Sequence, residues 1–137
     1  MTRRQWLCCC LLAAGCRPTQ SAPAGTGALE AVVAFYTALV HKDWDAAYAI
    51  LDASNRSRVT RQRFATLAGT FRGGIGFEPS SVQVSSCEEQ GERAVAHVVL
   101  IGRPSAHQRF KDAVTLRRGE DGWGVVLAPT FGVTRRR

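Results

Sequence analysis

Apolar residues recur at helical spacing over residues 28–51, the most strongly periodic stretch of the chain. In its first part, the apolar positions lie three, four or seven residues apart, at Leu29, Val32, Val33, Tyr36, Leu39 and Val40. After a polar break at residues 41–43, the same spacing resumes at Trp44, Ala47, Tyr48 and Leu51. Asp43 is suited to begin the second segment, because its carboxylate can accept hydrogen bonds from the free amides of a first helical turn. The pattern predicts two amphipathic helices joined by a short connection.

A third helix is predicted after residues 52–59, which are polar and which we interpret as a connection. Thr60 supplies an N-cap, and Val59 and Phe64 occupy the two positions of a hydrophobic staple. The apolar stripe of this helix consists of Phe64, Leu67, Ala68 and Phe71. The helix is expected to end near Arg72, because glycines follow at positions 73, 74 and 76.

The period changes to two from Ser80 onward, which is typical of β-strands. Val82 and Val84 alternate with polar residues, and a turn is predicted over residues 89–92. Residues 94–101 are apolar on both faces, so this strand is expected to be central. After a break at residues 104–106, we predict a strand over 110–117, a glycine-bounded turn over 119–122 and a last strand from Trp123 to Pro129. The order predicts a four-stranded antiparallel meander.

The two patterns together predict an α+β fold, in which three N-terminal helices pack on a curved four-stranded antiparallel sheet. A meander with one apolar face needs a cover, and the amphipathic helices supply it. A second apolar set on the sheet, which we place on its outer face, consists of Ala94, Ala96, Val98 and Leu100. Exposed patches of this kind mark interfaces, so a homodimer through the sheet face is one expected mode of association.

The N-terminus is typical of an exported lipoprotein. Arg3 and Arg4 precede an apolar run over residues 6–14, which is long enough for a signal peptide and too short to span a bilayer. Small residues then lead to Cys16, in a pattern that resembles the lipobox of bacterial lipoproteins, although Ala13 stands where leucine is usual. We therefore expect a signal peptide at residues 1–15 and an acylated Cys16 that attaches the protein to a membrane of the bacterial cell envelope. An ordinary cleaved signal peptide is the alternative, and the two arginines leave general and twin-arginine export both open.

Residues 17–27 are small, polar and rich in proline and glycine, which is typical of a flexible tether. Such a segment has a root-mean-square reach of roughly 18 Å. The chain has 137 residues, so the part that follows the tether has the length of one domain. The predicted division is an acylated cysteine and tether at 16–27, a folded domain at 28–128 and a basic tail at 129–137.

Charge and cysteine content narrow the function classes. The net charge is +7, but two of these charges are the leader arginines and three lie in the C-terminal Arg135, Arg136 and Arg137. The domain itself is therefore nearly balanced, and a nucleic-acid binder would instead carry a basic stripe interleaved with aromatic residues. Cys87 is the only cysteine after Cys16, so the domain has no disulfide framework. No cysteine or histidine spacing indicates a metal site, and no cofactor is expected.

Three short motifs resemble the nuclear transport factor 2-like superfamily, and most closely its small envelope lipoproteins. They are the Phe35-Tyr36 pair in the first helix, Asp43-Trp44 at the start of the second, and Asp121-Gly122-Trp123 at the last hairpin. The resemblance covers residues 28–128 and implies a cone of curved sheet wrapped around helices, whose interior is a ligand pocket in some members. Members similar to ketosteroid isomerase or polyketide cyclases use an acid and a tyrosine there. Those motifs do not map onto this chain, so no catalytic residue is carried over. Members also often have an extra strand between the second and third helices, which residues 52–59 do not predict.

Strand alternation singles out one pair of polar residues. His97 shares its strand face with Val95 and Val99, and Asp112 shares its face with Val114. A hairpin centred on residues 105–106 would make His97 and Asp112 diagonal neighbours, roughly 7–8 Å apart at Cα. Inside a cone they could serve as a general base and the group that orients it. The alternative is a buried polar pair, or an Asp112 that lies in water at the rim of the sheet.

Two further groups of residues are candidates for binding. Four arginines cluster about the start of the third helix, where they could hold a phosphate or carboxylate or simply lie in solvent: Arg56, Arg58, Arg61 and Arg63. Four aromatic residues fall in the helical and strand stripes, where they belong either to the core or to the lining of a pocket: Tyr36, Trp44, Tyr48 and Trp123.

The sequence therefore favours a membrane-anchored envelope lipoprotein. Its single domain is expected to bind a small ligand or another envelope protein without catalysis. The alternative is a small cone-fold enzyme, similar to an isomerase or cyclase, that uses His97 and Asp112 in its cavity.

Overall fold

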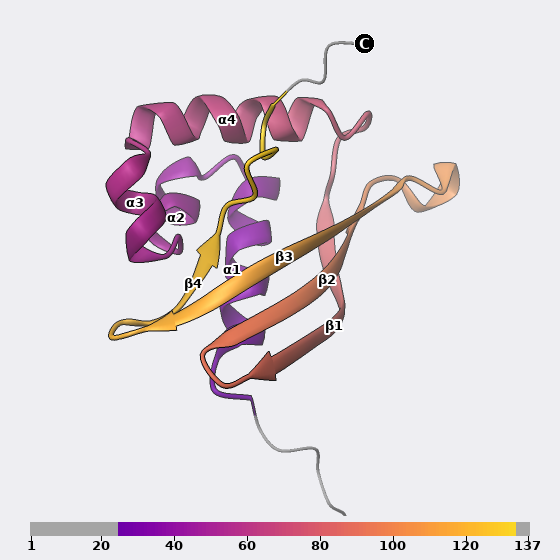
Figure 1. Cartoon of the computed structure of the whole chain (residues 1–137). Helices are drawn as coiled ribbons and strands as arrows, with labels where there is room; N and C mark the ends of the chain where they lie inside the picture. Colours follow the sequence, from indigo (N-terminus) through magenta and orange to yellow (C-terminus); the bar gives the residue numbers. More distant parts are fainter. Residues whose placement is uncertain (1–24, 134–137) are drawn as a thin grey trace, which may run out of the picture.

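The helices precede the sheet along the chain, as the sequence predicts (Figure 1). A computed structural model describes residues 25–133, so the predicted leader, Cys16 and the terminal arginines lie outside the described residues. The elements are α1 (Ala28–Val40), α2 (Trp44–Ala49), α3 (Ala53–Arg58), α4 (Arg61–Gly73), β1 (Ser81–Gln90), β2 (Arg93–Ile101), a 3-10 turn (Pro104–Ala106), β3 (Arg109–Gly119) and β4 (Gly122–Val126). The α+β class is confirmed. None of the helices within the described residues has the length and apolar character needed to cross a bilayer.

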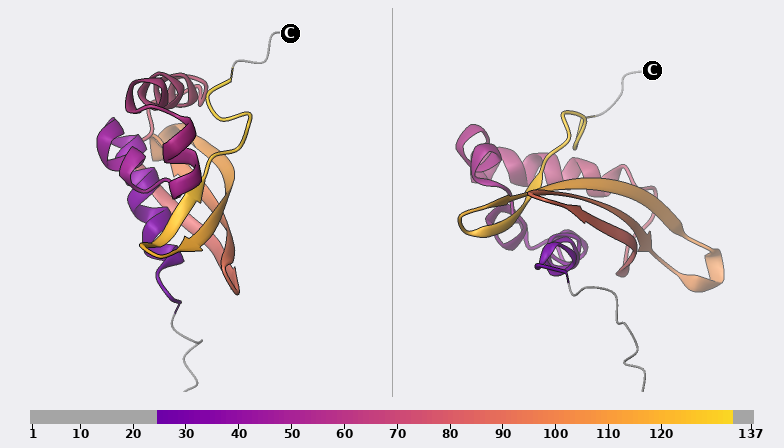
Figure 2. Two further views of the ribbon diagram at one scale, coloured as in Figure 1. Left: turned by 60° about the vertical axis from the view of Figure 1, so that its left-hand side comes forward. Right: turned by 60° about the horizontal axis from the view of Figure 1, so that its bottom comes forward.

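The four strands form one antiparallel sheet in the order β1-β2-β3-β4, which confirms the predicted meander. The sheet is curved, and α1 lies in its concave side, where Figure 2 shows the helix nearly end-on. α1 contacts β1, β2 and β4 as well as α2 and α4. The apolar face of this first helix therefore provides the centre of the core.

The buried side of β2 corrects the sequence analysis. Ala94, Ala96, Val98 and Leu100 all point into the core, and the outer face instead carries Val95, which is 45% exposed. Because β2 is apolar on both faces, its own pattern could not decide which face is buried. The pairing with β3 decides which face is buried. On the core face, Ala96 pairs with Val114 and Leu100 with Phe110. On the outer face, Val99 and Ile101 pair with the charged Lys111 and Arg109. The predicted apolar patch for a homodimer is thus the core face of the sheet.

The segment that we predicted as a polar connection forms helix α3. Asp52 caps it by accepting a 2.9 Å hydrogen bond from the backbone N–H of Asn55, and the hydroxyl of Tyr48 donates to the carbonyls of Arg56 and Val59, both at 2.8 Å. These contacts satisfy backbone groups at both ends, which a six-residue helix cannot satisfy internally. Between α2 and α3, the chain pairs with β4 through a parallel bridge between Leu51 and Val125.

Capping side chains also set the starts of the other three helices. Asp43 accepts a 3.1 Å hydrogen bond from Ala46 N–H, and Thr60 accepts one of 3.1 Å from Arg63 N–H, so both predicted caps are present. α1 is capped from a distance instead: Glu89 of β1 accepts hydrogen bonds from the backbone N–H groups of Thr26 at 2.9 Å and Ala28 at 3.3 Å. The predicted turn at 89–92 is correspondingly shorter, because β1 continues to Gln90.

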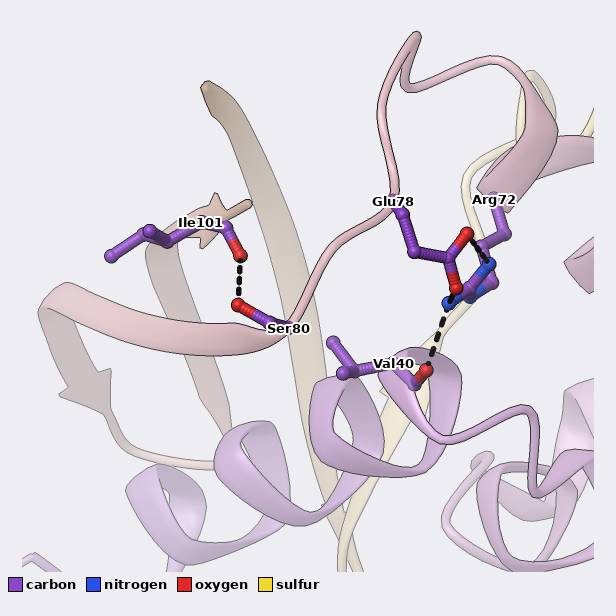
Figure 3. Close-up of polar contacts among 5 residues, drawn as sticks. All are labelled: Val40, Arg72, Glu78, Ser80 and Ile101. Carbon is purple, nitrogen blue, oxygen red and sulfur yellow. Dashed lines mark hydrogen bonds and ion pairs between the residues drawn. The ribbon is translucent and has the colours of Figure 1, made fainter. Parts of the chain in front are cut away.

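Arg72 joins the ends of three segments (Figure 3). Its Nη2 donates a 3.1 Å hydrogen bond to the carbonyl of Val40, the last residue of α1, and its Nη1 donates one of 2.9 Å to Glu78. The hydrogen bond from Arg72 lowers the pKa of the Glu78 carboxyl. Ser80 continues this junction into the sheet by donating to the carbonyl of Ile101 at 3.1 Å. The junction holds the C-terminal part of α4 to the end of α1 and to the segment that leads into β1.

Candidate functional site

A cavity of about 390 Å³ lies where β3 extends beyond β4. β4 pairs with β3 from Thr115 onward, and after Val126 the chain leaves the sheet and crosses toward α4. The gap between this departing segment and β3 opens onto α1 and α4. The residues that line it and that matter below are Phe35, Tyr36, Phe71, Asp112, Val114 and Phe131.

Tyr36 and Asp112 meet in this cavity. The tyrosine hydroxyl donates a hydrogen bond of 2.7 Å to Oδ2 of Asp112. Tyr36 is 1% exposed, and burial, followed by the charge of Asp112, raises the pKa of its phenol well above the ordinary range. The phenol therefore remains a hydrogen-bond donor at neutral pH. Asp112 is half-buried and stands opposite Val98 in the ladder, on the core face of the sheet.

Aromatic rings form the opposite wall of the cavity. Phe131 stacks on Phe71 with ring centroids 4.8 Å apart and planes inclined by 21°, and it lies parallel to Phe64 at 6.0 Å. We call residues 127–133 the C-terminal strap. It is held against α4 by Gly132, whose φ is +66°, at a place where an added Cβ would lie 2.2 Å from the carbonyl oxygen of Leu67. The cavity thus combines one carboxylate and one phenol with an aromatic wall.

The predicted contact between His97 and Asp112 is wrong. His97 pairs directly with Ala113, one register position from the Val98–Asp112 pair, so its side chain lies on the opposite, exposed face of the sheet. The parity of Asp112 was correctly derived from Val114, but His97 was assigned to the wrong face of β2. The hydrogen-bond partner of Asp112 is instead Tyr36, which belongs to the helical stripe that the sequence marks as core. The signal available in the sequence was that a tyrosine and an aspartate both occupy core-facing positions.

The four candidate arginines do not converge on one point. Arg61 contacts Asp45 at 3.4 Å and lies 5.3 Å from the ring centroid of Tyr48. Arg56 lines a separate cavity of about 240 Å³ between α3 and the β3–β4 hairpin. Arg58 and Arg63 are exposed. Anion binding by these residues remains a prediction.

Of the four candidate aromatic residues, Tyr36 alone lines the cavity of about 390 Å³. Trp44 and Tyr48 are half-buried and pack against the core. Trp123 borders the smaller cavity beside Arg56, and its indole N–H donates to the hydroxyl of Thr26 at 2.8 Å. Metal ligation has no basis in residues 25–133, where no group of three or more histidine, cysteine or acidic side chains could hold an ion.

Comparison with solved structures identifies the architecture. A protein from Campylobacter jejuni, proposed to be an NTF2-like transpeptidase, superposes with a TM-score of 0.60 at 12% sequence identity, over 73% of this chain and 97% of that one. The domain has the NTF2-like fold. Two further structures match with lower scores: a SEC-C motif containing protein from Rhodopseudomonas palustris (16% identity, 67% of this chain and 69% of that one, TM-score 0.47), and a proposed dehydratase of the NTF2-like family from Streptomyces avermitilis (14% identity, 70% and 86%, TM-score 0.40).

The resemblance inferred from the sequence is therefore confirmed at the level of the NTF2-like fold. No protein-family model matches the sequence, and no curated protein matches it. At these identities the solved structures show a shared fold, and the chemistry of the NTF2-like domain has to be argued from its own residues.

Proposed function

We propose that the protein is a membrane-anchored envelope lipoprotein whose NTF2-like domain binds a small ligand in the cavity between Tyr36 and Phe131, without catalysing a reaction. The observation that carries the proposal is the hydrogen bond between Tyr36 and Asp112 inside a cavity that is also lined by Phe35, Phe71 and Phe131. Ligand sites are typically apolar clefts of about 300–1,000 Å³ with a few polar groups that fix orientation. The volume of about 390 Å³ falls in that range.

The state of the two polar groups supports binding over catalysis. A general base needs a pKa near the working pH, whereas the pKa of Tyr36 is raised far above it. Asp112 already accepts the tyrosine hydrogen bond through Oδ2. No histidine and no second acidic residue is among the described residues that line the cavity.

The test of binding is a fragment screen followed by backbone NMR of the isotope-labelled protein. We expect hits whose chemical-shift changes gather at Phe35, Tyr36, Phe71, Asp112 and Phe131. Hits should also raise the melting temperature, because a ligand that binds the folded state stabilises it by mass action. A screen without any hit at these residues would reject the proposal.

The membrane attachment rests on the sequence around Cys16. Two acyl chains give stable attachment where one gives marginal binding, so the protein is expected in the membrane pellet even at high salt. The Cys16→Ser variant should be released from the pellet or accumulate with its leader uncleaved. An unchanged pellet fraction, with an intact mass that shows unmodified Cys16, would contradict lipidation.

An enzyme remains the second candidate, for one specific reason. A protonated phenol and a carboxylate 2.7 Å apart in a cavity could donate a hydrogen bond to a substrate and accept a proton from it. Under this alternative, Asp112 acts with Tyr36 in place of the His97 of the sequence analysis. Asp112→Asn would then lower a measurable turnover by about 10²-fold or more. A stable Asp112→Asn variant with that loss would replace the binding proposal by the enzymatic one.

A further inference from the structure

Asp112 is an acidic residue without a cationic partner. Within residues 25–133, the ion pairs of up to 4.0 Å engage Asp45, Glu78 and Asp52, and none involves Asp112. Its one hydrogen bond comes from the neutral hydroxyl of Tyr36 and uses Oδ2, which leaves Oδ1 without a donor in this part of the chain. A carboxylate that is half removed from water and not paired with a cation favours an incoming positive charge.

The residues around this carboxylate could pack against the apolar part of a cationic ligand. Phe71 and Phe131 form a stacked pair on one side, and Val114 and Phe35 contribute further apolar surface. Aromatic faces attract ammonium groups, more strongly where water is excluded, and they also bury apolar carbon. The cavity therefore offers charge neutralisation, a hydrogen-bond acceptor and an apolar surface together.

Arg93 is the one basic residue that lines the same cavity. It begins β2 and pairs with Arg117, whereas Asp112 pairs with Val98, five residues further along the strand, which corresponds to roughly 17 Å. Arg93 is also exposed, so its charge is screened by solvent. The half-buried carboxylate of Asp112 is therefore less screened by solvent than the guanidinium of Arg93.

We propose that the ligand of this cavity is an organic cation, namely an ammonium compound with an aromatic or branched apolar group. Its N–H donates to Asp112, and its apolar group packs on Phe71 and Phe131. This inference rests on the proposed ligand-binding function and specifies the chemical class of the ligand.

The test uses three probes with the same phenylethyl body and different charge: phenethylammonium, 2-phenylethanol and 3-phenylpropionate. Each is titrated by NMR into the full chain, held in phosphatidylcholine nanodiscs, with empty nanodiscs as the blank. We expect the ammonium to bind at least about tenfold more tightly than the alcohol, and the carboxylate to bind more weakly than both. Shifts at Tyr36 and Phe131 locate the binding.

Two variants separate the roles of charge and location. Asp112→Asn should weaken ammonium binding by about tenfold and leave alcohol binding within about threefold. Asp45→Asn, which removes an exposed carboxylate on α2, should change neither. If Asp112→Asn fails to fold, the binding of the three probes to the wild-type protein still tests the preference for a cation.

The outcomes distinguish this inference from the function on which it rests. Equal binding of the ammonium and the alcohol at Tyr36 and Phe131 would overturn the cation assignment and leave the binding proposal intact. Preferential binding of the carboxylate would overturn it in favour of an anion held by Arg93. No binding of any probe would overturn it too, and the fragment screen alone would then decide whether the cavity binds ligands.

Discussion

The hydroxyl of Tyr36 donates a 2.7 Å hydrogen bond to Oδ2 of Asp112, which joins the central helix α1 to strand β3 within the cavity. The contact links residues 76 positions apart in the sequence and joins a phenol to a carboxylate in the cavity. The hydrogen bond stabilises the fold and also orients the carboxylate. Its removal should therefore change both the stability of the protein and the position of the Asp112 side chain.

Tyr36→Phe should lower the free energy of unfolding by about 1–2 kcal/mol. The phenylalanine ring keeps the edge-to-face contact with Phe35, whose centroid lies 5.3 Å away, but Asp112 loses its donor. Urea denaturation at pH 7 measures the change. His97→Ala is the matched control, and because His97 is exposed, its effect should stay within about 0.5 kcal/mol. A loss for His97→Ala as large as that for Tyr36→Phe would contradict the assignment of faces.

Glu89→Gln should lower the melting temperature at pH 7 and have little effect in acid. The backbone hydrogen bond from Thr26, with those from its side chain and Ala28, lowers the pKa of Glu89 in the folded state. A group with a lowered folded pKa contributes stability above its unfolded pKa, about 4.3 for glutamate. That contribution is lost as the pH falls through the folded pKa.

The measurement is a series of thermal melts from pH 7 to pH 3 on wild type, Glu89→Gln and Glu88→Gln. Glu88 is the exposed neighbour on the same strand and makes no cap to α1. We expect the difference between wild type and Glu89→Gln to shrink toward pH 3. Identical pH profiles for the two variants would show that Glu89 does not cap α1.

Gly132→Ala should loosen the C-terminal strap. The residue has φ +66°, and a Cβ there would lie 2.2 Å from the carbonyl oxygen of Leu67, so the strap has to move away from α4. We expect a loss of about 1 kcal/mol or more in the free energy of unfolding, with NMR shifts at Phe131. Gly69→Ala in α4 is the matched change, because nothing lies within 4 Å of its added Cβ, and it should stabilise the helix by about 0.5–1 kcal/mol. Equal effects of the two substitutions would show that the strap is not seated on α4.

Cys87 should react slowly with iodoacetamide. Burial, and then the charges of Glu89 and Glu30, raise the pKa of its thiol, so less of the reactive thiolate is present at pH 8 than in an unstructured peptide. Cys87 is half-buried and is the one free cysteine of the described residues. Cys87→Ser should keep the melting temperature within a few degrees. A large loss of stability, or a disulfide dimer on a non-reducing gel, would count against this description.

The sequence predicted the fold where local patterns were decisive. Asp43 and Thr60 preceded clear apolar stripes, and both cap helices as expected. Glu89 could not be recognised as a cap, because its partners Thr26 and Ala28 lie 63 and 61 residues away. Helix α3 was missed because its stabilising contact, from the Tyr48 hydroxyl to Arg56 and Val59 carbonyls, is tertiary and leaves no apolar periodicity.

At the candidate site, the sequence indicated the correct face for Asp112 but not for His97. Asp112 shares one face of β3 with Phe110 and Val114, and the other face of this strand is mostly polar, so the direction of Asp112 could be derived from β3 alone. β2 is apolar on both faces, so the side that holds His97 depends on its pairing with β3. A one-residue difference in register moves every side chain to the other face of a sheet. Tyr36 was correctly placed in the core, but its contact with Asp112 becomes visible only when α1 lies against the sheet.

The central claim is that the space between Tyr36, Asp112 and the C-terminal strap is a binding site. A crystal structure of the protein soaked with the hits of the fragment screen tests it most directly. We predict ligand density within hydrogen-bonding distance of Asp112, against the rings of Phe71 and Phe131. Density confined to the groove on the outer face of α1, lined by Leu29 and Val33, or to the smaller cavity beside Arg56, would contradict the claim.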